Sequence, residues 1–236
     1  MRRTSMTRAP AQSRAPVRYG AALWARKLAA VVLILGVWVE SAAAEVRLLA
    51  FGDSLVQGYG LPAEEGFVPQ LSAWLAANGA SDVDVINGGV SGDTTAGGLA
   101  RISWALSETP DAVIVELGAN DMLRGLPLDE LRSNLDGILS IIAAENLPVL
   151  LVSVPSIANY GPDYEAEYRE IYADLADTYG ALFYPNFFAG ITEGRTLQEA
   201  QALMQPDGIH PNADGVRANV ELIGPSVLEL VTRARS

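Results

Sequence analysis

The chain alternates short apolar runs with segments in which apolar residues recur at helical spacing. The runs predict β-strands over residues 46–51, 83–86, 112–115, 149–154 and 182–184. Helical spacing marks residues 67–75, 99–106, 128–142, 164–179 and 213–232. The last of these helices is expected to bend at Pro225, which lacks an amide proton. Strands that alternate with helices predict a parallel sheet covered on both faces, in one doubly wound α/β domain.

This architecture predicts where the chemistry lies. Ligands of open parallel sheets bind beyond the carboxyl ends of the strands. The loops that follow the first three predicted strands are small, polar and rich in glycine: "GDS" at 52–54, "NGGVSGDT" at 87–94 and "LGAND" at 117–121. We therefore expect a functional site at this edge of the sheet.

The first 44 residues have the pattern of a secretory signal peptide. Seven basic residues and no acid occupy positions 1–27, and an apolar run of 12 residues follows at 28–39, too short to span a bilayer. The run is followed by Ala42, Ala43 and Ala44, so we expect cleavage between Ala44 and Glu45. The mature protein would then be periplasmic or secreted, with no membrane span. An uncleaved membrane anchor is the alternative.

Removal of this segment makes the chain strongly acidic. Residues 45–236 keep nine of the 16 basic residues and 27 of the 28 acidic ones, a net charge of −18. Such a surface repels nucleic acid and anionic membranes, so neither is an expected partner. The chain has no cysteine, which excludes a lipoprotein and a disulfide scaffold.

The chain has a single histidine, His210, in the segment "QPDGIHPNADG". A lone histidine without cysteine does not build a zinc site, and no loop has the spacing of a carboxylate metal site, so no metal is expected. Asp207 lies three residues ahead of it. Its carboxylate could accept the Nδ1 proton, which leaves Nε2 free as a base. A capping aspartate beside a structural histidine is the alternative.

Ser54 is the candidate nucleophile, because it follows the first strand at the expected edge. A serine hydroxyl needs an adjacent base, which His210 could provide. The chain has no G-x-S-x-G pentapeptide, which argues against an ordinary α/β-hydrolase. The backbone N–H groups of Ser54 and Gly92 and the side-chain amide of Asn120 could form an oxyanion hole. Taken alone, Gly92 and Asn120 could equally be turn residues.

Four blocks of this sequence resemble the SGNH hydrolases, also called GDSL esterases and lipases: "FGDSL", "GGVSGDT", "LGAND" and "DGIHPN". They occur in the family's order, and the likeness covers residues 46–232. It is greatest to the secreted branch of acyl-CoA thioesterase I, arylesterase and lysophospholipase. The resemblance implies a flavodoxin-like, three-layer α/β/α fold with a central parallel sheet of about five strands over residues 45–236.

The resemblance also implies the site. Ser54 would be the nucleophile, Asp207 and His210 its partners, and Ser54, Gly92 and Asn120 the oxyanion hole, with no cofactor. Asp53 would order the hydrogen bonds around the nucleophile. Residues 153–164 and 187–205 would form the walls of an acyl channel; the first departs from the family pattern at Pro155, Ser156 and Ile157.

The sequence thus predicts a serine esterase that hydrolyses carboxylic esters or thioesters of small acyl substrates through an acyl-enzyme. A carbohydrate acetylesterase of the same superfamily is one alternative, and it would require activity on acetyl esters only. A binding protein that has lost catalysis is the other, although the intact set of five site residues argues against it. The sequence leaves the acyl length and the oligomeric state open.

Overall fold

The computed structural model describes residues 45–156 and 160–236. Its centre is a five-stranded sheet in which each neighbouring pair is parallel, in the order β2-β1-β3-β4-β5. The strands are β1 (Val46–Gly52), β2 (Val83–Gly89), β3 (Ala112–Glu116), β4 (Val149–Val152) and β5 (Leu182–Tyr184). Every predicted strand is confirmed, and the described residues add no further strand to the sheet.

The boundaries differ from prediction by more than one residue at two strands. β2 runs on to Gly89, because its glycines continue to pair with the end of β1. β4 ends at Val152 instead of residue 154. The Ser153 N–H still donates to the carbonyl of Tyr184, the last residue of β5, and its hydroxyl donates to the Pro185 carbonyl. The pairing with β5 therefore ends directly after Val152, where β5 itself ends.

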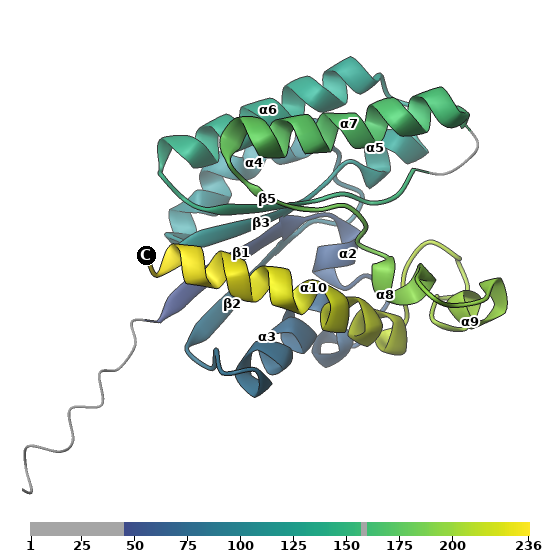
Figure 1. The fold of residues 1–236 in the computed structure, drawn as a ribbon, viewed down its shortest axis with the longest axis horizontal. Helices are drawn as coiled ribbons and strands as arrows, with labels where there is room; N and C mark the ends of the chain where they lie inside the picture. Colours follow the sequence, from purple (N-terminus) through teal and green to yellow (C-terminus); the bar gives the residue numbers. More distant parts are fainter. Residues whose placement is uncertain (1–44, 157–159) are drawn as a thin grey trace, which may run out of the picture. The chain divides into compact units, whose positions relative to one another are not determined.

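Helices cover both faces of the sheet, which gives the three layers expected (Figure 1). One layer contains α4 (Thr95–Ala105), α6 (Leu128–Ala144) and α7 (Pro162–Tyr179), and the other α3 (Phe67–Ala77) and α10 (Ala213–Ala234). Side chains alternate along β1, so Leu48 and Ala50 enter the core under α3 and α10, while Leu49 and Phe51 enter the core under α4, α6 and α7. Burial on both faces accounts for the continuous apolar run.

The five long helices are confirmed. The helix α10 continues through Pro225. A bend at this proline stays a prediction. Four further helices of four to six residues were not predicted: α2 (Ser54–Gln57), α5 (Ala119–Leu123), α8 (Ala189–Thr192) and α9 (Leu197–Ala202). The helices α2, α8 and α9 lie beyond one end of the sheet (Figure 1). Residues of these three helices line the pocket at the edge of the sheet where the sequence predicted the functional site.

The predicted signal peptide, residues 1–44, lies outside the described residues. Within 45–156 and 160–236, no helix is both long and apolar enough to span a bilayer.

Candidate active site

The local structure around Ser54 shows why a strand ends on a hydroxyl. β1 ends at Gly52, and Ser54 is already the first residue of α2. The Asp53 side chain caps this helix, because its Oδ1 accepts the Leu55 N–H at 3.0 Å. Gly58 ends the helix after one turn with a φ of 86°. The short helix therefore fixes the Ser54 side chain at the carboxyl edge of the sheet.

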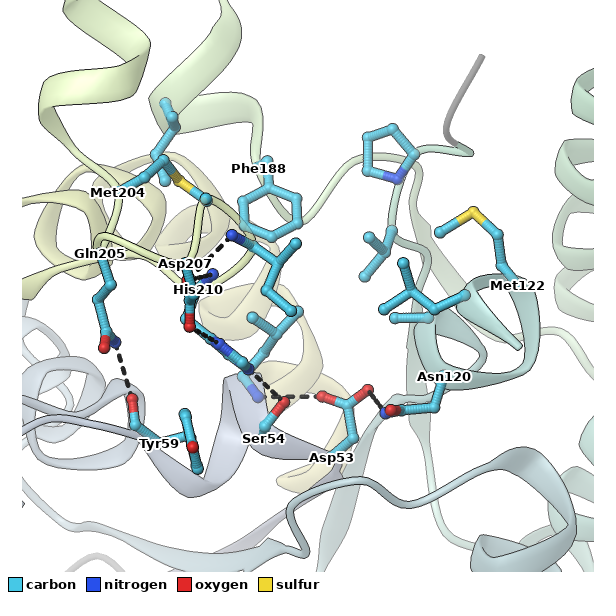
Figure 2. A pocket seen from close by; sticks show the side chains of 18 of the residues that line it. Asp53, Ser54, Tyr59, Asn120, Met122, Phe188, Met204, Gln205, Asp207 and His210 are labelled. Carbon is cyan, nitrogen blue, oxygen red and sulfur yellow. Dashed lines mark hydrogen bonds and ion pairs between the residues drawn. The ribbon is translucent and has the colours of Figure 1, made fainter. Parts of the chain in front are cut away.

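Ser54, His210 and Asp207 form a continuous hydrogen-bonded chain (Figure 2). The Ser54 Oγ lies 2.9 Å from the His210 Nε2. On the far side of the ring, Nδ1 lies 2.7 Å from the Asp207 Oδ2. The other oxygen of Asp207 accepts the backbone N–H groups of Ile209 and His210, at 3.0 and 3.1 Å. The turn that carries the histidine thus also orients its carboxylate partner.

The charge of Asp207 fixes the histidine tautomer. Desolvation alone would raise the pKa of Asp207, but hydrogen bonds from the His210 ring and from the Ile209 and His210 backbone outweigh it and lower this pKa. A carboxylate only accepts hydrogen bonds, so the proton of neutral His210 sits on Nδ1. Its Nε2 is left to accept the Ser54 proton. The Tyr59 ring, 4.7 Å from the imidazole between centroids, packs against it.

Besides Ser54 itself, the two other predicted oxyanion donors, Asn120 and Gly92, come from separate segments that border the same pocket as Ser54. Asn120 lies on α5, and its Nδ2 donates to the Asp53 Oδ2 at 2.9 Å. Gly92 follows β2 with a φ of 79°, a conformation that favours glycine. Arg124, at the end of α5, donates from Nη2 to the Gly92 carbonyl at 2.6 Å. This bond joins the two donor loops.

The pocket above Ser54 has a volume of about 1000 Å³. Predicted wall residues line it in both segments, including Val154 and Pro155 from residues 153–164 and Phe188, Ile191, Leu197 and Met204 from residues 187–205. Ile157 lies outside the described residues. Apolar side chains dominate this lining, which suits an acyl chain better than a polar ligand. Among the described residues, no cluster of three acidic or histidine side chains is arranged to hold a metal ion.

The structure thus gathers Ser54, Gly92, Asn120, Asp207 and His210 around one pocket. Sequence reasoning missed three neighbours that support them. Arg124 clamps Gly92, and Gln205 donates to the Tyr59 and Pro211 carbonyls at 2.8 and 3.0 Å. The third is Glu116, a buried acid at the end of β3. The sequence signals Glu116 only as an acidic residue at the end of the apolar run "AVIVE", residues 112–116.

An α/β protein with this serine, histidine and aspartate at the carboxyl edge of its sheet has the architecture of a serine hydrolase. The profile of the GDSL-like Lipase/Acylhydrolase family matches residues 50–218. The chain belongs to this family, so the resemblance to SGNH hydrolases is confirmed.

Named relatives cover most of the chain. An arylesterase of Vibrio mimicus is 38% identical over 80% of this chain and 90% of its own length. The thioesterase 1/protease 1/lysophospholipase L1 of Escherichia coli K12 is 37% identical over 73% of this chain and 79% of its own. The crystal structure of TesA superposes with a TM-score of 0.71 and 36% identity, covering 78% and 99% of the two chains. The protein is therefore an enzyme that hydrolyses carboxylic esters.

Proposed function

We propose that the protein cleaves carboxylic esters and thioesters through an acyl-enzyme on Ser54. The observation that carries the proposal is the 2.9 Å hydrogen bond between the Ser54 Oγ and the His210 Nε2, with Asp207 on the other ring nitrogen. A serine is a weak nucleophile until a base takes its proton. Here the base already lies at the distance required for that transfer.

In the first half of the reaction, Ser54 attacks the acyl carbon while His210 takes the hydroxyl proton. The oxygen that becomes negative in the tetrahedral intermediate accepts hydrogen bonds from the N–H groups of Ser54 and Gly92 and from the Asn120 amide. Collapse breaks the bond to the leaving oxygen or sulfur, which receives the proton from His210. In the second half, His210 activates water, which releases the acid and restores Ser54.

A fluorophosphonate probe tests the nucleophile directly. We expect it to label the wild-type protein once, at Ser54, as read by peptide mass spectrometry. Ser54→Ala should abolish labelling, and both Ser54→Ala and His210→Ala should lose nearly all turnover of an aryl ester while they stay folded. Ser156→Ala, a second serine that borders the pocket, is the matched control and should still be labelled. Labelling that persists in folded Ser54→Ala would refute the proposed nucleophile.

The apolar pocket favours acyl chains longer than acetyl. The relatives of this protein are named arylesterase, thioesterase and lysophospholipase. We therefore propose aryl esters, acyl-CoA and lysophospholipids as its substrate classes. Rates on aryl esters of graded acyl length, with an acyl-CoA and a lysophospholipid alongside, test this. The carbohydrate acetylesterase alternative requires turnover of acetyl esters only. The alternative of a binding protein without catalysis predicts no turnover of any substrate. Membership in a family of lipases and acylhydrolases argues against that alternative.

We also propose that residues 1–44 form a signal peptide and that residues 45–236 are the mature hydrolase domain, which needs no cofactor. Expression of the full chain in a bacterial host, followed by intact-mass measurement of the periplasmic fraction, should give a protein that begins at Glu45. Full-length protein retained in the membrane fraction would support the uncleaved anchor instead. Turnover should be unchanged by EDTA, and a loss of activity in EDTA would contradict the absence of a metal requirement.

A further inference from the structure

A fully buried acid lies beneath the turn that carries the nucleophile. Glu116 is the last residue of β3 and is 0% exposed. The sheet pairs it with Gly52, directly before Asp53 and Ser54. A Cβ atom at position 52 would come within 2.9 Å of the Glu116 Oε2. Glycine at that position therefore leaves the space that the Glu116 carboxyl group occupies.

The surroundings of Glu116 do not suit a negative charge. In the part of the chain that the structure describes, neither of its side-chain oxygens has a hydrogen bond of ordinary distance and angle, and Asp53, through its backbone N–H and its carboxyl group, is the one residue close enough to pair with them. The titratable groups that face it are Asp53 from the β1–α2 turn and the phenols of Tyr168 and Tyr172 on α7. No basic side chain of the described residues contributes to its electrostatics. A buried charge without a counter-charge and without well-formed hydrogen bonds is strongly disfavoured.

Asp53 has two donors of ordinary geometry, whereas Glu116 has none. It is buried too, but Leu55 N–H donates to its Oδ1 and the Asn120 amide to its Oδ2. Desolvation raises the pKa of Asp53, while those hydrogen bonds and the charge of His210 oppose the rise. The pKa of Glu116 is raised well above its usual value, first by burial and then by the charge of Asp53. Two adjacent buried carboxyl groups share one proton. The two hydrogen bonds that Asp53 accepts favour the charge on Asp53 and therefore the proton on Glu116.

We propose that Glu116 is a positioning residue for the oxyanion hole, which donates its carboxyl proton to Asp53 and thereby holds the Asp53 carboxylate against the Asn120 amide. This inference rests on the proposed function. Figure 2 shows Asp53 between Ser54 and Asn120. The Nδ2 atom of Asn120 carries two hydrogens. Asp53 accepts one of them at 2.9 Å, and the amide thus fixed keeps the second for the oxyanion.

The test compares two substitutions of similar size. Glu116→Met fills the space but offers no donor, whereas Glu116→Gln keeps a neutral donor beside Asp53. Because the loss of an oxyanion donor lowers kcat by about 100- to 1000-fold, we expect a displaced Asn120 amide in Glu116→Met to lower kcat at least about tenfold. KM for an aryl ester should change little. Glu116→Gln should recover most of the lost kcat, a rescue that a purely space-filling role does not predict.

A double variant shows whether Glu116 acts through Asn120. In an Asn120→Ala background the amide is gone, so adding Glu116→Met should lower kcat by no more than about twofold to threefold. A change of that size is close to the ordinary deviation from additivity between two substitutions. A full tenfold loss in that background would overturn the proposal. Equal kcat values for wild type and Glu116→Met would overturn it as well. An inactive wild-type protein, by contrast, is the failure of the proposed function itself.

Infrared spectroscopy gives a readout that does not require Glu116→Met to fold. The wild-type protein at neutral pH should show the C=O stretch of a buried protonated carboxyl group. That band should disappear in Glu116→Gln, which keeps the shape of the side chain. A spectrum without the band in wild-type protein would mean that Glu116 is ionised, and the proposal would then be wrong.

Discussion

At the scale of single residues, Asp53 links the proposed nucleophile to the proposed oxyanion hole. One of its oxygens caps α2, which presents Ser54, and the other holds Asn120. A single buried carboxylate therefore orients groups that come from two different strand ends. This is why an acid precedes the serine in "GDS": the residue before the nucleophile needs two acceptor oxygens on one short side chain.

The protonation of Glu116 makes a prediction about stability. In the unfolded chain Glu116 ionises above its ordinary pKa of 4.5, but in the folded protein its raised pKa keeps the proton bound. Folding then takes up a proton, so this residue lowers the free energy of unfolding as pH rises above 4.5. Glu116→Gln has no such titration. Its stability relative to wild type should rise with pH, by up to about 1.4 kcal/mol per pH unit.

Urea unfolding of both proteins between about pH 5 and pH 8 measures this difference. The matched control is Glu165→Gln, on the exposed side of the first turn of α7, where no pH-dependent difference of this size is expected. A stability difference between Glu116→Gln and wild type that stays constant over this range would show that Glu116 titrates normally in the folded state.

The sequence indicated which proposed catalytic residues come together, but not the residues that support them. Ser54, Asp207 and His210 belong to short motifs, and turn formation or packing alone rarely places a serine, an aspartate and a histidine together on neighbouring loops. Glu116 could not be assigned in the same way, because its role depends on burial and on the distance to Asp53 across the sheet. Both are properties of the folded chain and leave little trace in the order of residues.

At the scale of elements, long helices could be predicted from the sequence and short helices could not. Helices of 11 or more residues repeat their apolar face often enough to be recognised, as Leu128–Ala144 does. The helices α2, α5, α8 and α9 have at most six residues, too few for a periodic signal. Two of them have side-chain caps: Asp53 caps α2, and Thr196 and Glu199 form a capping box at α9. These short helices form much of the site, so its shape was the least predictable part of the fold.

Arg101 on α4 ties together the ends of two strands that carry the site. Its guanidinium donates to the carbonyls of Gly52 and Gly88, both at 2.9 Å, and pairs with Asp93 at 2.6 Å. Arg101→Met should lower the free energy of unfolding by about 2–4 kcal/mol, because these partners lose a partly buried donor. We expect kcat to fall too, since β1 and β2 lead into the loops of Ser54 and Gly92.

Arg132→Met is the matched control for chemical denaturation. Arg132 also pairs with an acid, Asp174, at 2.8 Å, but both side chains are largely exposed. Its loss should cost less than about 1 kcal/mol. If the two variants unfolded at the same denaturant concentration, the strand-tying role of Arg101 would be excluded.

At the scale of the whole molecule, the proposed mature chain, residues 45–236, has a net charge of −18, which bears on which substrates reach the pocket. Acyl-CoA is a polyanion, so its approach to this surface is opposed by long-range repulsion, whereas a neutral aryl ester feels none. Salt screens that repulsion, with a Debye length that falls from about 30 Å at 0.01 M to about 10 Å at 0.1 M. The kcat/KM for acyl-CoA should therefore rise several-fold over this range, on the order of threefold to tenfold.

The neutral aryl ester of the same acyl length is the control, because it shares the pocket but not the charge. Its kcat/KM should change by less than about twofold over the same salt range. Equal responses of the two substrates would mean that the acidic surface does not act on substrate approach. A rise confined to acyl-CoA would instead show that this enzyme, at low salt, discriminates against anionic thioesters before the acyl chain enters the pocket, so that charge as well as acyl length sets its substrate preference.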